Sequence, residues 1–421
     1  MILKKLAVYS LLASFIPGLF SCTKDKVTES YTFYRPVYQT SELARKSIKG
    51  AVAQPVEYPG KLVVKDHYLF LTELGKGVHV IDYSNPRQPK NIGFVNIPGN
   101  EDISVRGHYL YADCYTALAV IDIAQPENAT LTSFVNGVFP DRYTGLASDS
   151  NKIIISWARV DTTVTRRFSE SFDKALDNTV WVLNDAAFSS NAIVKAATGN
   201  TNSTAGSMAR FALADDRMYV VGTSELRVFN TVDAAQPAFV KNVALFMSGI
   251  ETIYPYKNNL FIGTQVGMLI YSISNKDNPV KAGQFGHVKV CDPVVADDDY
   301  AYVTLRAGSG CGSNNVNELN VLSVADLTNP ALVKAYTLTN PYGLSKDGDL
   351  LLVCDGKAGL KIFDAAKADD VKQVGALAGF DAYDVITLNG TALVSGKGAF
   401  LFVDYSDPAH PSVLSQLTIA K

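Results

Sequence analysis

Short apolar runs, each closed by a polar residue and a turn, alternate along most of this 421-residue chain. In Gly77–Pro89 the apolar stretch ends on Asp82, and the prolines that follow stop an extended strand. The pattern recurs, and the residues that close the runs are Asp82, Asp122, Asn184, Asn230, Ser272, Ser323, Asp364 and Asp404. Their spacing is mostly 40 to 46 residues, a period typical of repeat architectures.

Each repeat predicts four β-strands. Two apolar strands flank a tight turn such as Asn389–Gly390, and a Gly-rich loop such as Gly75–Gly77 leads to the recurring run, which becomes the third strand. The fourth strand carries a Val-Lys pair in several repeats, for example Val280–Lys281, and a lysine suits an exposed sheet edge. One such sheet cannot bury both faces, but sheets packed around a ring can. We therefore expect an all-β fold over residues 61–421, a β-propeller of eight four-stranded blades.

The third repeat is the least regular, and it leaves a seven-bladed propeller open as the alternative. Trp181 and Asn184 depart from the pattern of its third strand, and the insertion Arg159–Asp177 lies just ahead of that strand. The sixth repeat is extended at the same place by Ala307–Glu318. Because repeat folds gather such additions on one face, we expect both insertions on one rim and the proline-rich exit after Asp82 on the other.

Residues 1–21 have the pattern of a secretion signal. Lys4 and Lys5 precede an apolar run, Leu6–Phe20, that is shorter than the ~20 residues a membrane-spanning helix needs. The run closes on Leu19–Cys22, which resembles the lipobox of bacterial lipoproteins. The resemblance implies that cleavage leaves Cys22 as a lipid-modified N-terminus.

The residues around this cysteine also bear on location. Thr23 rather than an aspartate follows Cys22, which by analogy with lipoprotein sorting implies the outer membrane. Lys24–Asp25 resembles a short signal that sends some lipoproteins to the cell surface. We read residues 22–60 as a tether between the lipid and the propeller, with a short capped helix at Ser41–Ile48.

The recurring third strand resembles a known repeat. At Val78–Asp82, Ala119–Asp122 and Phe400–Asp404 it is similar to the LVIVD repeat of β-propeller proteins exported by bacteria. Tyr34–Tyr38 also resembles the N-terminal part of lipoproteins in that family. The resemblance implies the propeller fold and an envelope location, and the short motif implies little about chemistry.

Composition and charge exclude several classes of function. A net charge of −3 gives no electrostatic basis for binding nucleic acid. The five histidines are scattered singly, without a zinc-binding spacing. The acidic run Asp297–Asp299 could attract calcium, but it occupies the same turn of the repeat as Asp215–Asp216 and lacks a calcium-loop spacing. We therefore expect no metal and no cofactor.

Four cysteines remain after Cys22. Cys291 precedes the first strand of the sixth repeat and Cys311 lies in its insertion, so both reach the same rim of one blade. We predict a disulfide between them, which an exported protein can form. Cys114 and Cys354 belong to blades that are not neighbours, and we expect them to stay free.

The candidate site lies just ahead of the first strand of each repeat, where a propeller chain approaches the mouth of its central channel. The candidate ligand-binding residues at these positions are Glu101, Glu251, Asp292, Tyr342 and Tyr383. Such residues also serve simply to satisfy backbone groups where a loop becomes a strand. The carboxylates could alternatively act as a general acid and base, as in glycosidases.

We interpret the chain as a lipid-anchored binding or scaffolding module at the cell envelope, with an envelope protein or glycan as its partner. The alternative is an envelope enzyme that acts on a glycan or another small substrate through the channel-mouth carboxylates. Because propellers host many unrelated functions, the fold favours neither alternative, and we expect binding more than catalysis.

Overall fold

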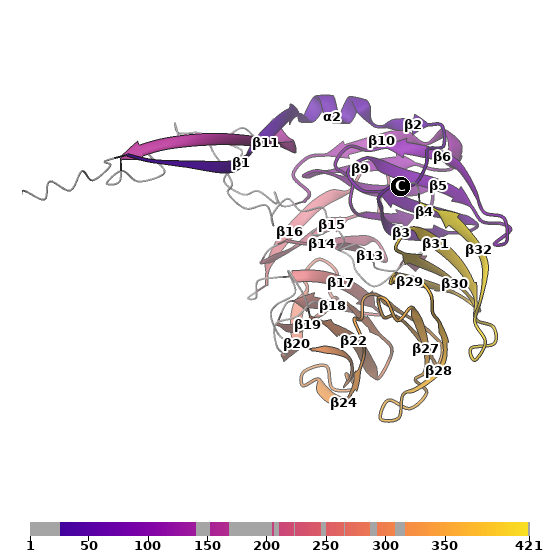
Figure 1. Ribbon diagram of the computed structural model, residues 1–421. Coiled ribbons are helices and arrows are strands. Elements are labelled where there is room, and N and C mark those ends of the chain that lie inside the picture. The colour runs from indigo at the N-terminus through magenta and orange to yellow at the C-terminus, as the bar shows by residue number, and fades with distance from the viewer. Residues whose placement is uncertain are drawn as a thin grey trace, which may run out of the picture. The chain divides into compact units, whose positions relative to one another are not determined.

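The computed structural model describes residues 26–139, 152–167, 204–205, 210–222, 224–245, 250–264, 266–286, 293–307 and 316–419. The chain divides into two compact units. One comprises Met1–Pro36 and Trp157–Asp185, and the other comprises Val37–Ser156 and Ala186–Lys421. Two long strands, β1 (Lys26–Thr40) and β11 (Lys152–Arg167), pair as a two-stranded sheet. The second unit holds the repeats (Figure 1).

In the part of the chain that the structure describes, the repeats form seven blades, each with four antiparallel strands in sequence order. Blades 1 to 4 consist of β3 (Pro59–Lys65), β4 (Tyr68–Glu73), β5 (Gly77–Asp82) and β6 (Lys90–Asn96); β7 (Ile103–Arg106), β8 (Tyr109–Cys114), β9 (Ala117–Asp122) and β10 (Thr130–Val135); β13 (Phe211–Ala214), β14 (Arg217–Val221), β15 (Glu225–Asn230) and β16 (Ala238–Ala244); and β17 (Ile250–Tyr256), β18 (Asn259–Thr264), β19 (Gly267–Ser272) and β20 (Val280–Gly286).

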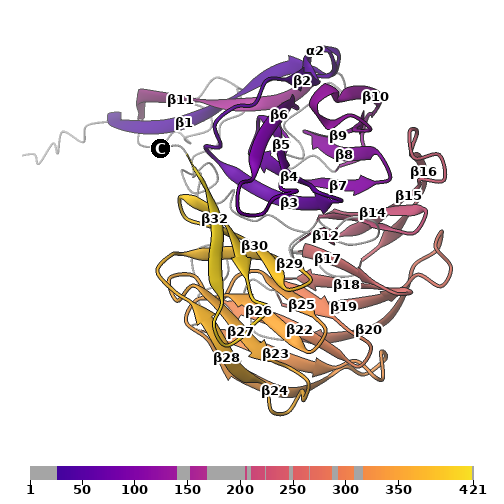
Figure 2. The ribbon, with the colours of Figure 1, turned by 90° about the vertical axis from the view of Figure 1, so that its right-hand side faces the viewer.

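The remaining blades follow the same order around the ring, from orange to yellow in Figure 2. Blades 5 to 7 consist of β21 (Val294–Ala296), β22 (Tyr300–Arg306), β23 (Asn317–Ser323) and β24 (Ala331–Thr337); β25 (Leu344–Asp347), β26 (Leu350–Cys354), β27 (Leu360–Asp364) and β28 (Lys372–Leu377); and β29 (Ala382–Leu388), β30 (Thr391–Gly396), β31 (Ala399–Asp404) and β32 (Ser412–Thr418). The first strand of each blade is innermost and the fourth is outermost.

The prediction of eight blades is wrong, and the propeller has seven. Each described third strand ends on the residue that closes its apolar run, from Asp82 in β5 to Asp404 in β31. The exception is Asn184, which lies outside the described residues. The chain from Lys152 to Arg167, assigned from the sequence to a third repeat and its insertion, instead pairs with β1. A strand must satisfy its backbone hydrogen bonds somewhere, and β1 supplies the partner that a blade would have supplied.

One contact repeats around the whole ring and joins each blade to the next. In every fourth strand the pairing register shifts by one residue, as at a β-bulge, and the residue after the shift meets the exit turn of the following blade. The residues at this position are Gly93, Ser133, Lys241, Gly283, Lys334, Gly375 and Ser415.

Three residue types meet the exit turn in different ways. Gly283 and Gly375 leave room for the backbone of the next turn, because a Cβ would overlap the carbonyl oxygens of Leu327 and Pro408. Ser133 Oγ donates a hydrogen bond to the Ala235 carbonyl at 2.6 Å. The lysines reach further, as Lys241 and Lys334 do to Asn278 and the Asp369 carbonyl. The recurring motif is therefore also the surface on which the blades assemble.

The ring closes without an exchanged strand, because all four strands of blade 7 come from the C-terminal end of the chain. Ser415 in β32 donates to the Pro86 carbonyl in the exit turn of blade 1, which repeats the same contact. Behind it, Leu62 and Leu69 of blade 1 pack in one buried cluster with Phe400 of blade 7. Burial of apolar side chains therefore closes the ring.

Blade 1 carries an additional strand on each edge, in the order β12-β3-β4-β5-β6-β2. On the outside, the predicted short helix is present as α2 (Ser41–Ser47), capped by Thr40 Oγ1, and leads into β2 (Lys49–Ala51), which pairs with β6. On the channel side, β12 (Thr204–Ala205) pairs with β3. Within the described residues, no helix has the length and apolar character needed to cross a membrane.

Candidate binding site at the channel mouth

The innermost strands of all described blades begin at the same end of the channel, because the blades share one connectivity. At one matched position of the repeat, in or just ahead of these strands, four blades carry a charged residue, namely Lys61, Asp102, Arg210 and Asp384. Each lies one position after the matched residue of its repeat from which the candidates were drawn, namely Gly60, Glu101, Ala209 and Tyr383. Because side chains alternate along a strand, that single step changes the face on which they lie.

Lys61 and Asp102 form a buried ion pair between blades 1 and 2. The Lys61 side chain is 1% exposed and Asp102 is 5% exposed, and the ammonium donates a hydrogen bond to Oδ1 of Asp102. The other carboxylate oxygen of Asp102 accepts from the backbone N–H of Arg210 at 3.0 Å. The ammonium also lies 5.4 Å from the centre of the Phe211 ring. This pair therefore joins three successive blades at the mouth.

Burial dominates the electrostatics of this pair. It lowers the pKa of Lys61, although Asp102, Asp113 and Asp384 oppose the shift. Burial also raises the pKa of Asp102, against the lowering effect of the Lys61 ammonium. Each charge is thus stable in the interior mainly because the other is present, so loss of either partner leaves an expensive buried charge.

Glu101 lies beside this pair, in a loop held by the carboxylate of Asp113. Oδ1 of Asp113 accepts from the backbone N–H of Glu101 at 2.7 Å, from that of Asp102 at 2.9 Å and from the Asn100 side-chain amide at 2.8 Å. Asp113 comes from the end of β8, where the chain turns towards the third strand. It is therefore a structural carboxylate that fixes the entry to β7.

In other blades, too, a carboxylate at the end of the second strand accepts hydrogen bonds from backbone N–H groups ahead of the first strand. In blade 1, the carboxylate of Glu73 accepts from the backbone N–H groups of Glu57 and Tyr58 at 3.0 and 2.7 Å, and from Nε2 of the buried His79 at 3.0 Å. In blade 6, Asp355 accepts from the N–H groups ahead of β25. The sequence reasoning missed these acidic residues, whose only signal was a carboxylate at the end of a second strand.

The two predicted tyrosines come together in blades 6 and 7. The rings of Tyr342 and Tyr383 lie 5.2 Å apart at an angle of 59°. The Arg306 guanidinium, from the end of β22 in blade 5, lies 4.1 Å from the centre of the Tyr342 ring, close enough for a cation–π contact. All three side chains are half-buried, so three blades present one partly exposed stack of side chains at the mouth. We call this stack of Arg306, Tyr342 and Tyr383 the ladder.

The other predicted site residues are placed less completely. Glu101 is half-buried in blade 2, apart from the tyrosine ladder of blades 6 and 7. Glu251 lies in β17, and its side chain is outside the described residues. Asp292, Cys291 and Cys311 lie outside them entirely, so the predicted disulfide stays a prediction. Cys114 and Cys354 are free and buried, in blades 2 and 6.

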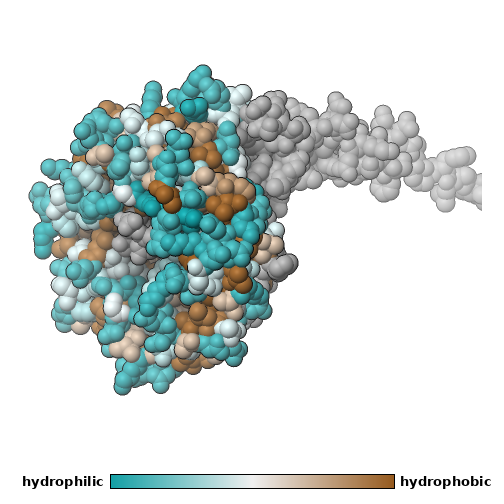
Figure 3. Space-filling model, turned by 180° about the vertical axis from the view of Figure 1, so that it is seen from behind, coloured by the Kyte–Doolittle hydropathy of each residue, from teal (hydrophilic) through white to brown (hydrophobic). Residues whose placement is uncertain are grey.

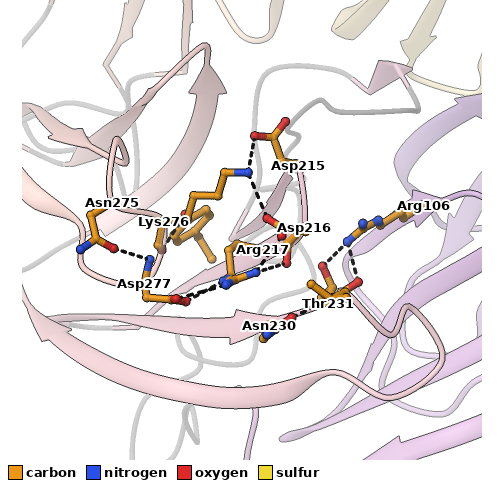
Figure 4. Close-up of polar contacts among 11 residues, drawn as sticks. Arg106, Asp215, Asp216, Arg217, Asn230, Thr231, Asn275, Lys276 and Asp277 are labelled. Carbon is orange, nitrogen blue, oxygen red and sulfur yellow. Dashed lines mark hydrogen bonds and ion pairs between the residues drawn. The ribbon is translucent and has the colours of Figure 1, made fainter.

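The opposite end of the ring carries the acidic turns, and cations neutralise them. Lys276 contacts Asp215 at 2.9 Å and Asp216 at 3.2 Å, while Arg217 bonds to Asp277 of the next blade (Figure 4). Asp297 pairs in the same manner with Lys346 of blade 6 at 2.9 Å. Among the described residues, no group of three or more histidine, cysteine or acidic side chains could hold a metal ion. These turns are therefore contacts between blades.

The face of the molecule in Figure 3 has a mostly hydrophilic coloured surface, on which hydrophobic residues form small, separate groups. The exposed apolar residues of the fourth strands include Val280, Leu332 and Val413. Lone exposed residues are normal on a globular surface. The view therefore favours a site built from a few specific side chains.

Comparison with known proteins identifies the repeat. Residues 100–136, which include all four strands of blade 2, match the model of the LVIVD repeat. No curated protein sequence matches the chain.

Solved structures with a similar fold share little sequence. The periplasmic gluconolactonase PpgL of Pseudomonas aeruginosa is 11% identical, with a TM-score of 0.52, over 86% of this chain and 96% of that one. A protein from Lactobacillus plantarum is 13% identical, with a TM-score of 0.51, over 84% and 96% of the two chains. The designed protein Ika8 is 7% identical, with a TM-score of 0.51, over 89% and 92%. At these identities the likeness shows the fold alone. The chain is a β-propeller of the LVIVD-repeat kind.

Proposed function

We propose that this protein is a lipid-anchored propeller of the cell envelope that binds an envelope component at its channel mouth. The observation that carries the proposal is the ladder of Arg306, Tyr342 and Tyr383, which three blades bring together and leave partly exposed. Aromatic rings and arginine carry a large share of the energy of binding surfaces, because they bury much area and keep a polar end.

The anchor rests on the sequence. The apolar run that ends on Leu19–Cys22 supports lipid attachment at Cys22, Thr23 supports the outer membrane, and Lys24–Asp25 supports exposure at the cell surface. In the described chain, α2 and β2 lead directly to the outer edge of blade 1, so a tether ending there would hold the propeller by one blade.

The contacts of the carboxylates favour binding over catalysis. Both oxygens of Asp102 are engaged, one by Lys61 and the other by the backbone of Arg210. Asp113 holds three donors with one oxygen. A general acid or base must reach the substrate, and these groups reach the backbone instead. Of the acidic residues predicted from the sequence at this end, Glu101 is the one whose side chain the structure describes, and its substitution tests the enzyme alternative.

Two experiments test the proposal. Cys22→Ser should abolish lipid labelling and release the protein from the membrane fraction, because one modified residue carries the anchor. A labelled, membrane-bound Cys22→Ser protein would refute the lipoprotein assignment.

For binding, the soluble propeller is coupled to beads and exposed to envelope extract, and captured components are quantified by mass spectrometry. Tyr342→Ala and Tyr383→Ala should each lower capture at least tenfold, whereas Glu101→Gln should leave it nearly unchanged. Thermal melts confirm that each variant folds. Turnover of envelope glycans that is lost only in Glu101→Gln would establish the enzyme alternative and refute the binding module.

A further inference from the structure

A cavity of about 340 Å³ opens between the outer strands of blades 2 and 3, away from the inner strands that form the channel. Val135 and Asn136 line it from the end of β10. Arg227 and Phe229 line it from β15, and Phe239 and Asn242 from the outermost strand β16. This volume lies within the range of small-molecule sites.

The aromatic wall of the cavity is fixed and partly exposed. Phe229 is buried and meets Phe239 edge to face, with ring centres 5.6 Å apart at 70°. Phe239 itself is 58% exposed, an unusual position for so large an apolar side chain. The buried ring therefore holds the exposed one in place as a platform.

The charge in the cavity is already neutralised. The Arg227 guanidinium bonds to Glu225 Oε1 at 2.6 Å through Nε and again through Nη2. Its Nη1 donates to the Gly137 carbonyl at 2.9 Å. Arg227 thus supplies a rigid planar wall, and its pairing with Glu225 removes the attraction for an anionic ligand.

Two asparagine amides supply neutral polar groups. Asn136 and Asn242 are both exposed. Asn136 Oδ1 accepts from Ser41 Oγ at 2.8 Å, which leaves its amide nitrogen to donate. Because the Asn242 side chain is exposed, its amide can offer both a donor and an acceptor to a ligand.

We propose that this cavity binds a neutral saccharide. A sugar ring has an apolar C–H face that would lie on Phe239, and neighbouring hydroxyls that both donate and accept, as the two amides do. An extended peptide would instead need a longer edge, whereas this cavity draws on the ends of only two blades. The site is independent of the channel mouth and of the function proposed for it.

The test uses the soluble propeller on an array of neutral oligosaccharides, with uronic-acid oligosaccharides and immobilised peptides as comparison probes. Wild-type protein should retain neutral saccharides, and both Phe239→Ala and Asn242→Ala should weaken that binding at least tenfold. Leu332→Ala is the matched control, because Leu332 pairs with Leu322 as Phe239 pairs with Phe229 and is 49% exposed. It should bind as the wild type does.

Phe239 and Asn242 are exposed, so their loss should leave thermal stability nearly unchanged, and Asn242→Ala preserves the test if Phe239→Ala unfolds. Three outcomes would overturn the proposal. The first is that the wild-type protein retains no neutral saccharide. The second is that Phe239→Ala, Asn242→Ala and Leu332→Ala all bind equally. The third is that the protein retains only acidic saccharides or peptides.

Discussion

Replacing Lys61 by methionine should destabilise the propeller strongly, because it leaves the buried carboxylate of Asp102 without its cationic partner. Lys61 is 1% exposed and Asp102 is 5% exposed, so water cannot replace the lost partner. Breaking one side of a buried ion pair typically costs about 3–5 kcal/mol, whereas replacing both sides by neutral groups costs much less. We therefore expect Lys61→Met to lower the unfolding free energy by about 4 kcal/mol. The double variant Lys61→Met/Asp102→Asn should recover a large part of that loss.

The stability lost in Lys61→Met should also change with pH, in a direction set by the pKa of Asp102. Burial already raises the pKa of Asp102, and loss of Lys61 removes the group that opposes the shift. A carboxyl whose folded pKa is raised stabilises the protein below its unfolded pKa, and that stability is lost as pH rises through the folded pKa. The deficit of Lys61→Met should therefore be smaller at pH 5 than at pH 8.

Urea unfolding followed by circular dichroism, for the wild type, both single variants and the double variant, measures the coupling between the two side chains. Asp102→Asn alone tests the reverse loss, since it leaves the buried ammonium of Lys61 with Asp113 and Asp384 as its remaining electrostatic partners. A deficit for Lys61→Met below about 1 kcal/mol, or one that does not change with pH, would refute the reasoning.

Three further predictions concern the blades. Gly283→Ala should cost about 1–3 kcal/mol in a thermal melt, because its Cβ would overlap the Leu327 carbonyl, while Gly286→Ala in the same strand meets only ordinary contact and should cost much less. Glu73→Gln should cost about 2 kcal/mol at pH 7. Burial raises the Glu73 pKa, but hydrogen bonds from His79, Glu57 and Tyr58 lower it overall, so the difference between Glu73→Gln and wild type should vanish as pH falls through that lowered value. Burial raises the pKa of Cys114 to about 12 and that of Cys354 well above its usual value, so neither thiol should react with a thiol reagent until the protein unfolds.

The sequence predicted the strands well because turn chemistry marks them locally. Asp66, Asp215 and Asn389 adopt positive φ in the tight turns where a residue tolerant of that conformation was expected. The prediction of an eighth blade was wrong for the opposite reason, because no local signal marks which sheet a strand joins. The apolar run at the start of Lys152–Arg167 fits any sheet, and nothing local distinguishes a strand of a blade from one that pairs with β1.

The role of the candidate residues in binding stays a prediction, and the count along the repeats did not identify the buried ion pair beside them. Counting back along the repeats selected Glu101, and the residue that forms the buried ion pair is Asp102. Lys61 was missed because a lysine in an inner strand reads as a solvent-exposed residue, and only the carboxylate of a neighbouring blade allows it to be buried. Tyr342 and Tyr383 were selected by the same count, and the structure brings their ring centres to 5.2 Å from one another.

The comparison of equivalent positions separates the residues that build the ring from those that distinguish its mouth. Where each fourth strand meets the next blade, the seven described blades use only glycine, serine or lysine, since that contact must fit one exit turn. At the starts of the inner strands the blades use different residues, some positive, some negative and some neutral. In chain order these are Lys61, Asp102, Arg210, Thr252, Pro293, Gly343 and Asp384. Part of that variety serves the ring itself, since Lys61 pairs with Asp102 and a Cβ on Gly343 would overlap the carboxylate of Asp384. We therefore propose that the partly exposed side chains beside them, those of Arg306, Tyr342 and Tyr383, distinguish a ligand, and that substitutions there change recognition without weakening the ring.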